Sequence, residues 1–494
     1  MTEGEQHAES SSREVTTLHA DRIKLYSDAL WASIATLMVA PILNSKYMHT
    51  LIHTHDEKKK EEIMLTFQTQ TKIYFLTFLI TCNTWAKHVW SFQLLQYVTD
   101  LSVFINMNIL LFASILPYSY LILSIFHRGT SMPIIIYCIL QLIISIFQIG
   151  IVIHSFRYPQ LLQRNLRDKP DQEKKNIRNR VLGKLMFGPI ILVIAIIVTY
   201  FSIDAALVCL AFIMASEWLQ ALLRRLFLLV PGLQNSTFVQ KLSRTDVMFV
   251  ERITMHRLEA FSDGVTAIAF TLIILDIMQE QQLTKTMVKD KFHNDLFLAL
   301  ASKWPFLVSY VAAFIFISMF WYTHMTLFKQ FKECSRLNQL INNLHLSFVG
   351  SFPLCFKLGT AFKESNLMKL GVQLGSGAVF LGSSLLLLIY GLTLVRIKFE
   401  DDPTITWMNK DVCFGGKYMK ILTAQLSILP ITGCVSFIIS FFTSALTAGI
   451  CFASMAVVSL LAMMAVNITN YFLYEHNIQE TTDHTENRPL LPAE

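Results

Sequence analysis

A short polar signature occurs twice in the chain, each time at the start of a hydrophobic segment. An ionisable side chain at the mouth of a membrane span is costly unless it has a partner or a role. The repetition therefore indicates a duplicated membrane protein whose duplicated helix lies near its working centre. The copies are R-x-x-x-Y-S-D, with Arg22, Tyr26, Ser27 and Asp28, and R-x-x-x-F-S-D, with Arg257, Phe261, Ser262 and Asp263.

The composition predicts an all-α polytopic membrane protein. Of the 494 residues, 53% are hydrophobic and 15% are charged, whereas soluble domains carry about 25% charged residues. Apolar stretches of about 20 residues recur, each long enough to cross a bilayer. They are continuous rather than alternating, which excludes an outer-membrane barrel. The net charge of +6 arises in loops, where it sets orientation, and does not indicate a nucleic-acid partner.

Twelve spans are expected, six in each half. The division is a tail at 1–21, a first repeat at 22–230, a linker at 231–255, a second repeat at 256–473 and a tail at 474–494. Basic clusters at 157–184 and at the joint between the halves place both termini in the cytosol. The polar N-terminus has no apolar h-region, so we expect no cleaved signal peptide. The spans are 24–44, 71–96, 98–124, 131–154, 181–203, 205–230, 258–278, 303–328, 336–360, 368–397, 416–442 and 445–473.

The duplication extends beyond the signature at a nearly constant offset of 235 or 236 residues. Six spans per copy is an even number, so the copies share one orientation and are related by an axis along the membrane normal. One chain supplies two copies of the first helix, and a two-fold homodimer would supply four around a central path. The further matches are Trp85 with Trp321, His88 with His324, Ile105-Asn106 with Ile341-Asn342, and Pro117 with Pro353.

Within each signature helix, a hydroxyl follows the aspartate by eight residues. Asp28 precedes Thr36, and Asp263 precedes Thr271, so each pair lies on roughly one helical face. Two interpretations stay open for this face. The charged residues can be a structural pair that ties helices together while the hydroxyls bond to their own helix, or part of the helix can line a pore.

The paired signatures, the six spans per repeat and the W-x-x-H match resemble the twelve-span, twice-repeated endolysosomal potassium channel family over essentially the whole chain. The resemblance implies a homodimer in membrane lipid whose first and seventh spans line a pore with an apolar constriction. It implies K⁺ as permeant ion, and H⁺ when the lumen is acid. Such a channel helps to set organelle membrane potential and lumenal pH. The chain has no T-V-G-Y-G filter, in contrast to other potassium channels.

The resemblance assigns pore residues by position. Ile268 falls at the constriction of the second repeat and Thr271 at a hydroxyl layer one turn on. In the first repeat the same offset reaches Ser33, with Ile34 one residue later, while Thr36 keeps its place. A narrow apolar ring blocks ions by dewetting. Ser33 would therefore widen or wet the narrow point and lower the barrier, unless a small helix rotation presents Ile34 instead.

Titratable residues near the signature are candidates for acid-dependent behaviour. Asp28 and Asp263 are candidates for proton exchange. His88 and His324 are further candidates, with packing or capping as the structural alternative. Asp276 ends the seventh span, where it either attracts cations to a lumenal vestibule or is a solvated helix-end carboxylate.

The C-terminal tail contains an acidic dileucine pattern, Glu486 followed by Leu490 and Leu491. A clathrin adaptor that reads this signal would route the protein to the endosome and lysosome membrane.

The runner-up function is a secondary transporter, because two parallel six-helix repeats also build that architecture. The loop after the second span lacks the G-x-x-x-D-R-x-G-R pattern of that class, and Glu217 is the main mid-membrane acid. An enzyme is not expected, because H-E-x-x-H and Walker A motifs are absent. The eight cysteines are scattered, so neither a disulfide framework nor a metal site is predicted, and no cofactor is expected.

Overall fold

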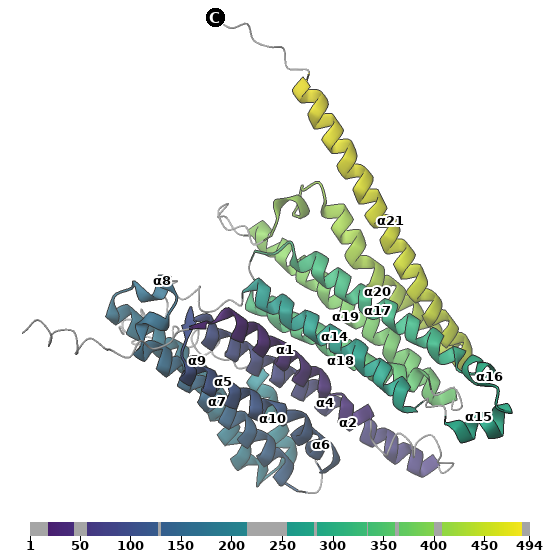
Figure 1. Ribbon diagram of the computed structural model, residues 1–494, viewed down its shortest axis with the longest axis horizontal. Coiled ribbons are helices and arrows are strands. Elements are labelled where there is room, and N and C mark those ends of the chain that lie inside the picture. The colour runs from purple at the N-terminus through teal and green to yellow at the C-terminus, as the bar shows by residue number, and fades with distance from the viewer. Residues whose placement is uncertain are drawn as a thin grey trace, which may run out of the picture. The chain divides into compact units, whose positions relative to one another are not determined.

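A computed structural model describes residues 18–43, 57–126, 130–214, 254–280, 284–332, 334–360, 365–399 and 408–486. The chain forms two compact units, Met1–Val265 and Thr266–Glu494. Apart from one pair of two-residue strands, the regular structure in the described residues is helical (Figure 1).

The first unit is a bundle in which α7 packs against α4, α5, α6 and α9. Figure 1 shows α5, α7 and α9 running side by side. Helix α1 packs against α4 and α5, and α10 against α4 and α9. The elements are β1 (Leu18–His19), α1 (Asp21–Leu37), α2 (Ala40–Leu43), α4 (Glu57–Gln93), β2 (Tyr97–Val98), α5 (Asp100–Ser114), α6 (Leu116–Phe126), α7 (Met132–Arg157), η1 (Pro159–Leu161), α8 (Arg164–Arg167), α9 (Asp171–Thr199), α10 (Ile203–Met214) and the first turns of α14 (Met255–Glu280).

The second unit is a bundle built around a core rich in phenylalanine. Phe316, Phe320 and Phe352 are almost fully buried there, together with Ala269 and Ile273 of α14. The elements are the remainder of α14, α15 (Lys285–Phe292), α16 (Leu296–Ala301), α17 (Trp304–Phe328), α18 (Arg336–Gly359), α19 (Ser365–Phe399), η3 (Lys410–Val412), α20 (Met419–Phe442) and α21 (Ala445–Glu486).

The order in which the helices pack on one another is the same in both units. This similarity covers more of the chain than the matching residues do. In the first unit α5 packs on α7, α7 on α9, α9 on α10, and α10 on α4. In the second unit α18 packs on α19, α19 on α20, α20 on α21, and α21 on α17. The two series run in the same chain order. The internal duplication therefore includes the later helices, which lie beyond the residues that match in sequence.

Within the described residues, nine helical segments are long and apolar enough to cross a membrane. The all-helical membrane class is thus confirmed, whereas the count of twelve stays a prediction. Helices α4 and α18 do not reach that hydropathy because they bury polar side chains inside their bundles, among them Lys87 and His88 in α4 and Asn342 and His345 in α18. Of the sixth predicted span, 205–230, only the part up to Met214 is described.

The two matched prolines have different effects on their helices. Pro117 lies beside the break between α5 and α6, whereas Pro353 lies inside the continuous helix α18. A proline removes one backbone donor and crowds the carbonyl four residues earlier, so it either breaks or bends a helix. The loops after α4 and α17 do match, because the isolated bridge Leu95–Leu162 has a counterpart in Phe331–Met408.

Candidate functional site

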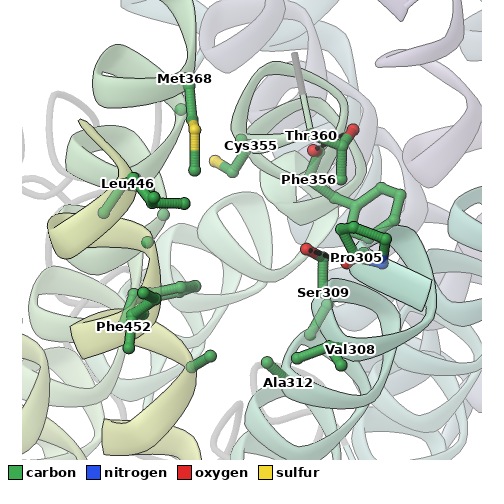
Figure 2. A pocket seen from close by; sticks show the side chains of 18 of the residues that line it. Pro305, Val308, Ser309, Ala312, Cys355, Phe356, Thr360, Met368, Leu446 and Phe452 are labelled. Atoms are coloured by element: carbon green, nitrogen blue, oxygen red, sulfur yellow. Dashed lines mark hydrogen bonds between the residues drawn. The ribbon is translucent and has the colours of Figure 1, made fainter. Parts of the chain in front are cut away.

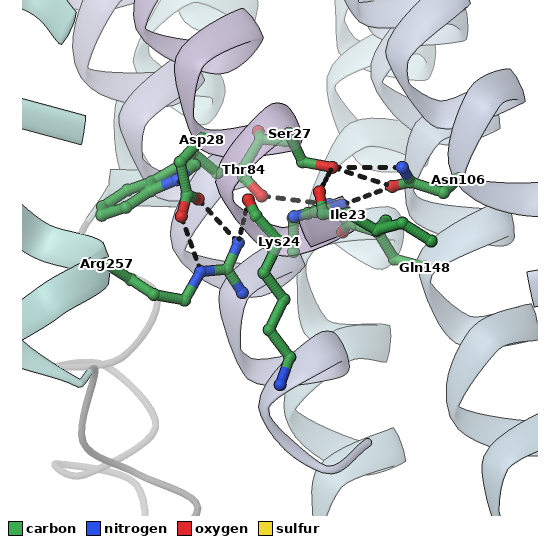
Figure 3. A network of polar contacts seen from close by, with 10 residues as sticks. Ile23, Lys24, Ser27, Asp28, Thr84, Asn106, Gln148 and Arg257 are labelled. Atoms are coloured by element: carbon green, nitrogen blue, oxygen red, sulfur yellow. Dashed lines mark hydrogen bonds and ion pairs between the residues drawn. The ribbon is translucent and has the colours of Figure 1, made fainter. Parts of the chain in front are cut away.

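A buried ion pair joins the two signatures. Arg257 donates from Nε to Asp28 Oδ2 at 2.7 Å and from Nη2 to Asp28 Oδ1 at 2.6 Å (Figure 3). Trp85 of α4 donates from Nε1 to the same Oδ1 at 2.8 Å. The exposed fraction is 4% for Arg257 and 0% for Asp28. A two-point arginine–carboxylate contact is strong and geometrically specific, so it fixes the start of α14 against α1.

Two apolar contacts accompany this ion pair. The rings of Phe261 and Trp85 are stacked, with centroids 4.0 Å apart and planes 16° apart. A Cβ on Gly264 would lie only 2.7 Å from Ala32 Cβ, so the approach of α14 to α1 requires a residue without a side chain at this position. The arginine and phenylalanine of the second signature thus contact the aspartate and tryptophan of the first repeat.

The serine of the first signature belongs to a second buried network. Asn106 of α5 donates from Nδ2 to Ser27 Oγ at 3.1 Å (Figure 3). His88 Nε2 lies 2.8 Å from Asn106 Oδ1. Because an amide oxygen only accepts hydrogen bonds, the imidazole donates this one.

The His–Asn bond is reproduced in the second repeat. His324 Nε2 lies 2.9 Å from Asn342 Oδ1, and both side chains are buried. Each histidine also stacks on the phenylalanine four residues later, with ring centroids 4.6 Å apart for His88 and Phe92 and 4.3 Å apart for His324 and Phe328. Both histidines therefore lie in packed, hydrogen-bonded positions. The signal for this repeated bond in the sequence is the shared offset of 236 residues between the two histidines and between the two asparagines.

The open face of α1, meaning the side that the rest of the first unit leaves uncovered, carries Ser33. The neighbouring Ile34 lies on the covered side. Ser33 is half-buried, whereas Ile34 has an exposed fraction of 2% and Thr36 of 0%. Thr36 donates from Oγ1 to the carbonyl of Ala32 at 2.8 Å. Thr36 was expected to contribute its hydroxyl to a layer along the pore. In the structure this hydroxyl is instead buried inside the bundle and hydrogen-bonded within its own helix. Arg22, Tyr26, Ala29 and Leu37 are exposed on the Ser33 side.

The open face of α14 begins at Asp263 and includes Thr271. Thr271 is exposed and donates from Oγ1 to the carbonyl of Ile268 at 2.9 Å. Ile268 is half-buried beside it. Exposed residues follow at helical spacing as Asp263, Ala267, Thr271, Ile274 and Met278. Ser33 and Ile268 are thus the one pair of matched pore candidates with the same half-buried environment in both copies.

Asp276 is not a free vestibule carboxylate. It is 8% exposed and accepts a hydrogen bond from Lys357 Nζ of α18 at 3.0 Å. The lysine balances the carboxylate charge locally. The sequence had suggested either a carboxylate that attracts cations or a solvated carboxylate at a helix end, and the buried ion pair is neither of these. The ion pair ties the later part of α14 to α18.

The sorting residues lie at the edge of the described chain. Helix α21 ends at Glu486, while Leu490 and Leu491 lie outside the described residues. Among the residues that the structure places, no group of three or more His, Cys, Asp or Glu side chains could hold a metal ion, and all eight cysteines are free thiols.

A separate apolar cavity lies in the second unit between α17, α18, α19 and α21 (Figure 2). Its volume is about 140 Å³, and its walls include Ser309, Phe356, Met368 and Phe452. No signature residue lines it. The cavity is therefore distinct from the site built by α1 and α14.

The fold and the site define a polytopic helical membrane protein with a duplicated helical unit and a buried Arg–Asp pair between its signature helices. The family model described as "Endosomal/lysosomal potassium channel TMEM175" matches residues 22–117 and 257–353, so each match begins at a signature arginine. Both regions of the chain are thus similar to this family. The proteins that the chain resembles are ion channels and not enzymes.

Curated relatives match over most of the chain. The endosomal/lysosomal proton channel TMEM175 of Gallus gallus is 28% identical over 423 residues, which cover 85% of this chain and 81% of the relative. The protein of the same name from Danio rerio is 28% identical over 436 residues, covering 88% and 81%. A potassium channel of Streptomyces collinus is 37% identical over 97 residues, covering 20% of this chain and 43% of that protein.

Proposed function

We propose that this chain is a cation channel of the endosomal and lysosomal membrane. It conducts K⁺, and also H⁺ when the lumen is acid. The observation that carries this proposal is the double family match, which starts at Arg22 and at Arg257 and includes α1 and α14. The names of the relatives, which are proton and potassium channels, support both permeant ions.

The working assembly is a homodimer in which two copies each of α1 and α14 surround a central path. Parallel repeats with an even number of spans give this pseudo-four-fold arrangement. Each repeat contributes six spans, at 22–230 and 256–473, and both termini lie in the cytosol. The linker at 231–255 and the tails at 1–21 and 474–494 lie on the same side.

The constriction lies at the level of Ser33 and Ile268. These matched residues are half-buried on the open sides of α1 and α14, so a homodimer would place two serines and two isoleucines around the path. Thr271 supplies a hydroxyl one turn on. Thr36 is buried and bonded to Ala32, so the hydroxyl layer has two threonines and not four.

The cellular role follows from the permeant ions. A K⁺ conductance sets the organelle membrane potential, and an H⁺ conductance limits lumenal acidification. The dileucine pattern with Glu486, Leu490 and Leu491 recruits a clathrin adaptor, which delivers the protein to these membranes.

Ion flux in reconstituted liposomes tests the proposal. Vesicles loaded with K⁺ and diluted into a K⁺-free medium should lose K⁺ at a rate that rises linearly with the gradient, as expected for a passive pore. Protein-free vesicles prepared in parallel give the background. Saturable uptake against a gradient would overturn the channel proposal in favour of a secondary transporter.

A further inference from the structure

The apolar cavity of the second unit lies at one end of the helix bundle, where α17, α19 and α21 begin and α18 ends. Along α17 its walls run from Trp304 to Ala313, which corresponds to about 14 Å of helix. Half of the hydrocarbon core of a bilayer is about 15 Å thick. The cavity therefore has the depth of one leaflet of the membrane.

The walls of the cavity pass from exposed to buried side chains. Trp304 of α17 and Leu446 of α21 have exposed fractions of 64% and 62%, whereas Ala312, Phe352 and Met368 are buried. Figure 2 shows the residues of α17 and those of α21 on opposite sides of the cavity. Exposed apolar side chains on a membrane-spanning helix face the hydrocarbon of the bilayer. The cavity therefore opens on a surface that faces lipid.

Both hydroxyl groups in the walls are already bonded to their own helices. Ser309 donates from Oγ to the carbonyl of Pro305 at 2.9 Å, and Thr360 donates from Oγ1 to the carbonyl of Phe356 at 3.0 Å. A buried water needs about two to four polar partners, whereas an apolar cavity of about 150 Å³ stays dry and binds a molecule of the size of benzene. At about 140 Å³, this cavity accommodates a short hydrocarbon segment.

We propose that the cavity binds one acyl chain of a membrane phospholipid. The chain enters between α17 and α21 from the leaflet at this end of the bundle and extends toward Ala312. Lys303 at the start of α17 and Lys369 early in α19 supply positive charge for the phosphate of the headgroup. An exposed tryptophan such as Trp304 is typical of the interface between membrane and water.

The bound chain stabilises the core in which α14 is packed. Phe352 lines the cavity and also belongs to the phenylalanine-rich core that includes Ala269 and Ile273 of α14. Further along α18, Lys357 pairs with Asp276 of α14. An acyl chain against Phe352 therefore adds apolar contacts to the part of α18 that also holds α14.

Photolabelling of the full-length protein in phosphatidylcholine liposomes tests the proposal without reference to ion flow. The probe is a phosphatidylcholine with a diazirine in one acyl chain, and mass spectrometry of peptides locates the labelled residues. Phe352, Phe356 and Met368 are buried walls of the cavity, so label reaches them when a chain enters. Leu388 of α19 is exposed and lies outside the cavity, so it reports labelling by the surrounding lipid.

Two variants close the cavity in different ways. Ala312→Phe fills it, and Val308→Trp narrows its entrance at an exposed position. Either variant should lower the labelling of Phe356 several-fold relative to that of Leu388. The matched control is Val311→Trp, which places the same side chain at an exposed position of α17 outside the cavity and should leave the labelling unchanged.

Thermal unfolding in detergent provides an independent measurement. Added phosphatidylcholine should raise the apparent midpoint because it binds the folded protein. The rise should be smaller for Val308→Trp than for Val311→Trp. If Ala312→Phe does not fold, the comparison of these two tryptophan variants decides the outcome.

Three results would contradict the proposal. Label can appear at Leu388 and at none of the three buried residues, or Val308→Trp can be labelled and stabilised by lipid to the same extent as Val311→Trp. A free fatty acid that carries the same diazirine distinguishes the source of the chain. Labelling of the buried residues by the fatty acid alone overturns the assignment to a phospholipid.

Discussion

Removing the Arg257 side chain should destabilise the protein far more than removing an exposed arginine. Arg257→Ala deletes both charge-assisted hydrogen bonds to Asp28 and leaves that carboxylate with Trp85 as its remaining donor in these contacts. The carboxylate stays at 0% exposure, where water cannot replace the lost partner. Breaking a buried pair in this way costs about 3–5 kcal/mol.

The reverse deletion should cost at least as much. Asp28→Ala leaves the guanidinium of Arg257 and the indole N–H of Trp85 without their shared acceptor, and a buried unsatisfied donor costs about 1–3 kcal/mol. The double variant Arg257→Met/Asp28→Leu removes both charges and fills the space with apolar atoms. It should cost less than the sum of the single changes by about 2 kcal/mol, because no buried charge is left alone.

Thermal unfolding of the purified protein in detergent provides the assay. Each single change should lower the apparent midpoint of the first unit by roughly 5–9 °C, compared at one scan rate because unfolding of large proteins is often irreversible. The matched control is Arg164→Ala, since the Arg164 and Asp168 side chains are 82% and 64% exposed and 3.9 Å apart. An exposed pair of this kind contributes at most about 1 kcal/mol.

Two results would refute this reasoning. If Arg257→Ala shifts the midpoint no more than Arg164→Ala, the buried pair does not hold α14 against α1. If the double variant is destabilised by the full sum of the two single effects, Arg257 and Asp28 contribute to stability independently, although they are in contact.

Three further outcomes are expected. Ser33→Ile should reduce the current at equal surface expression, because an isoleucine ring dewets more readily; an unchanged current would exclude Ser33 from the constriction. Gly371→Val should destabilise the second unit by about 3 kcal/mol or more, because a Cβ there would lie 2.1 Å from the Gly359 backbone nitrogen. Gly391→Ala, on the same helix with no atom within 4 Å of the added Cβ, should be neutral or slightly stabilising in the same melting assay. Lys357→Met should cost about 3 kcal/mol by leaving Asp276 buried without its lysine; if Asp276→Asn/Lys357→Met melts no higher than Lys357→Met, the ion pair is not the cause.

The signature helices were predictable because two signals coincide there. A costly charge at the start of an apolar segment appears twice in one register, and both α1 and α14 form where this pattern predicts them. The shared offset of His88 and Asn106 with His324 and Asn342 likewise anticipates a repeated structure. Their direct hydrogen bonds required the folded arrangement of α4 with α5 and of α17 with α18.

Helical spacing could not tell which face of each signature helix is covered. Asp28 and Thr36 have the same spacing as Asp263 and Thr271, yet the first pair is buried and the second is exposed. The difference arises from tertiary contacts, because the start of α14 covers Asp28 through Arg257. Nor could a constant offset show that the arginine of one copy binds the aspartate of the other. Hydropathy alone also underestimates α4 and α18 as membrane spans, because their buried polar side chains lower the mean hydropathy from which spans are predicted.

The most direct test of channel function is a patch-clamp recording from whole endolysosomes under K⁺/Na⁺ bi-ionic conditions, repeated with an acid lumen. A K⁺ pore predicts a current whose reversal potential lies on the K⁺ side of zero, with its exact value set by the mixed Ser33 and Ile268 constriction. Acidifying the lumen should then shift the reversal potential toward the proton equilibrium value. The absence of current above that of untransfected organelles, at confirmed expression, would contradict the channel assignment.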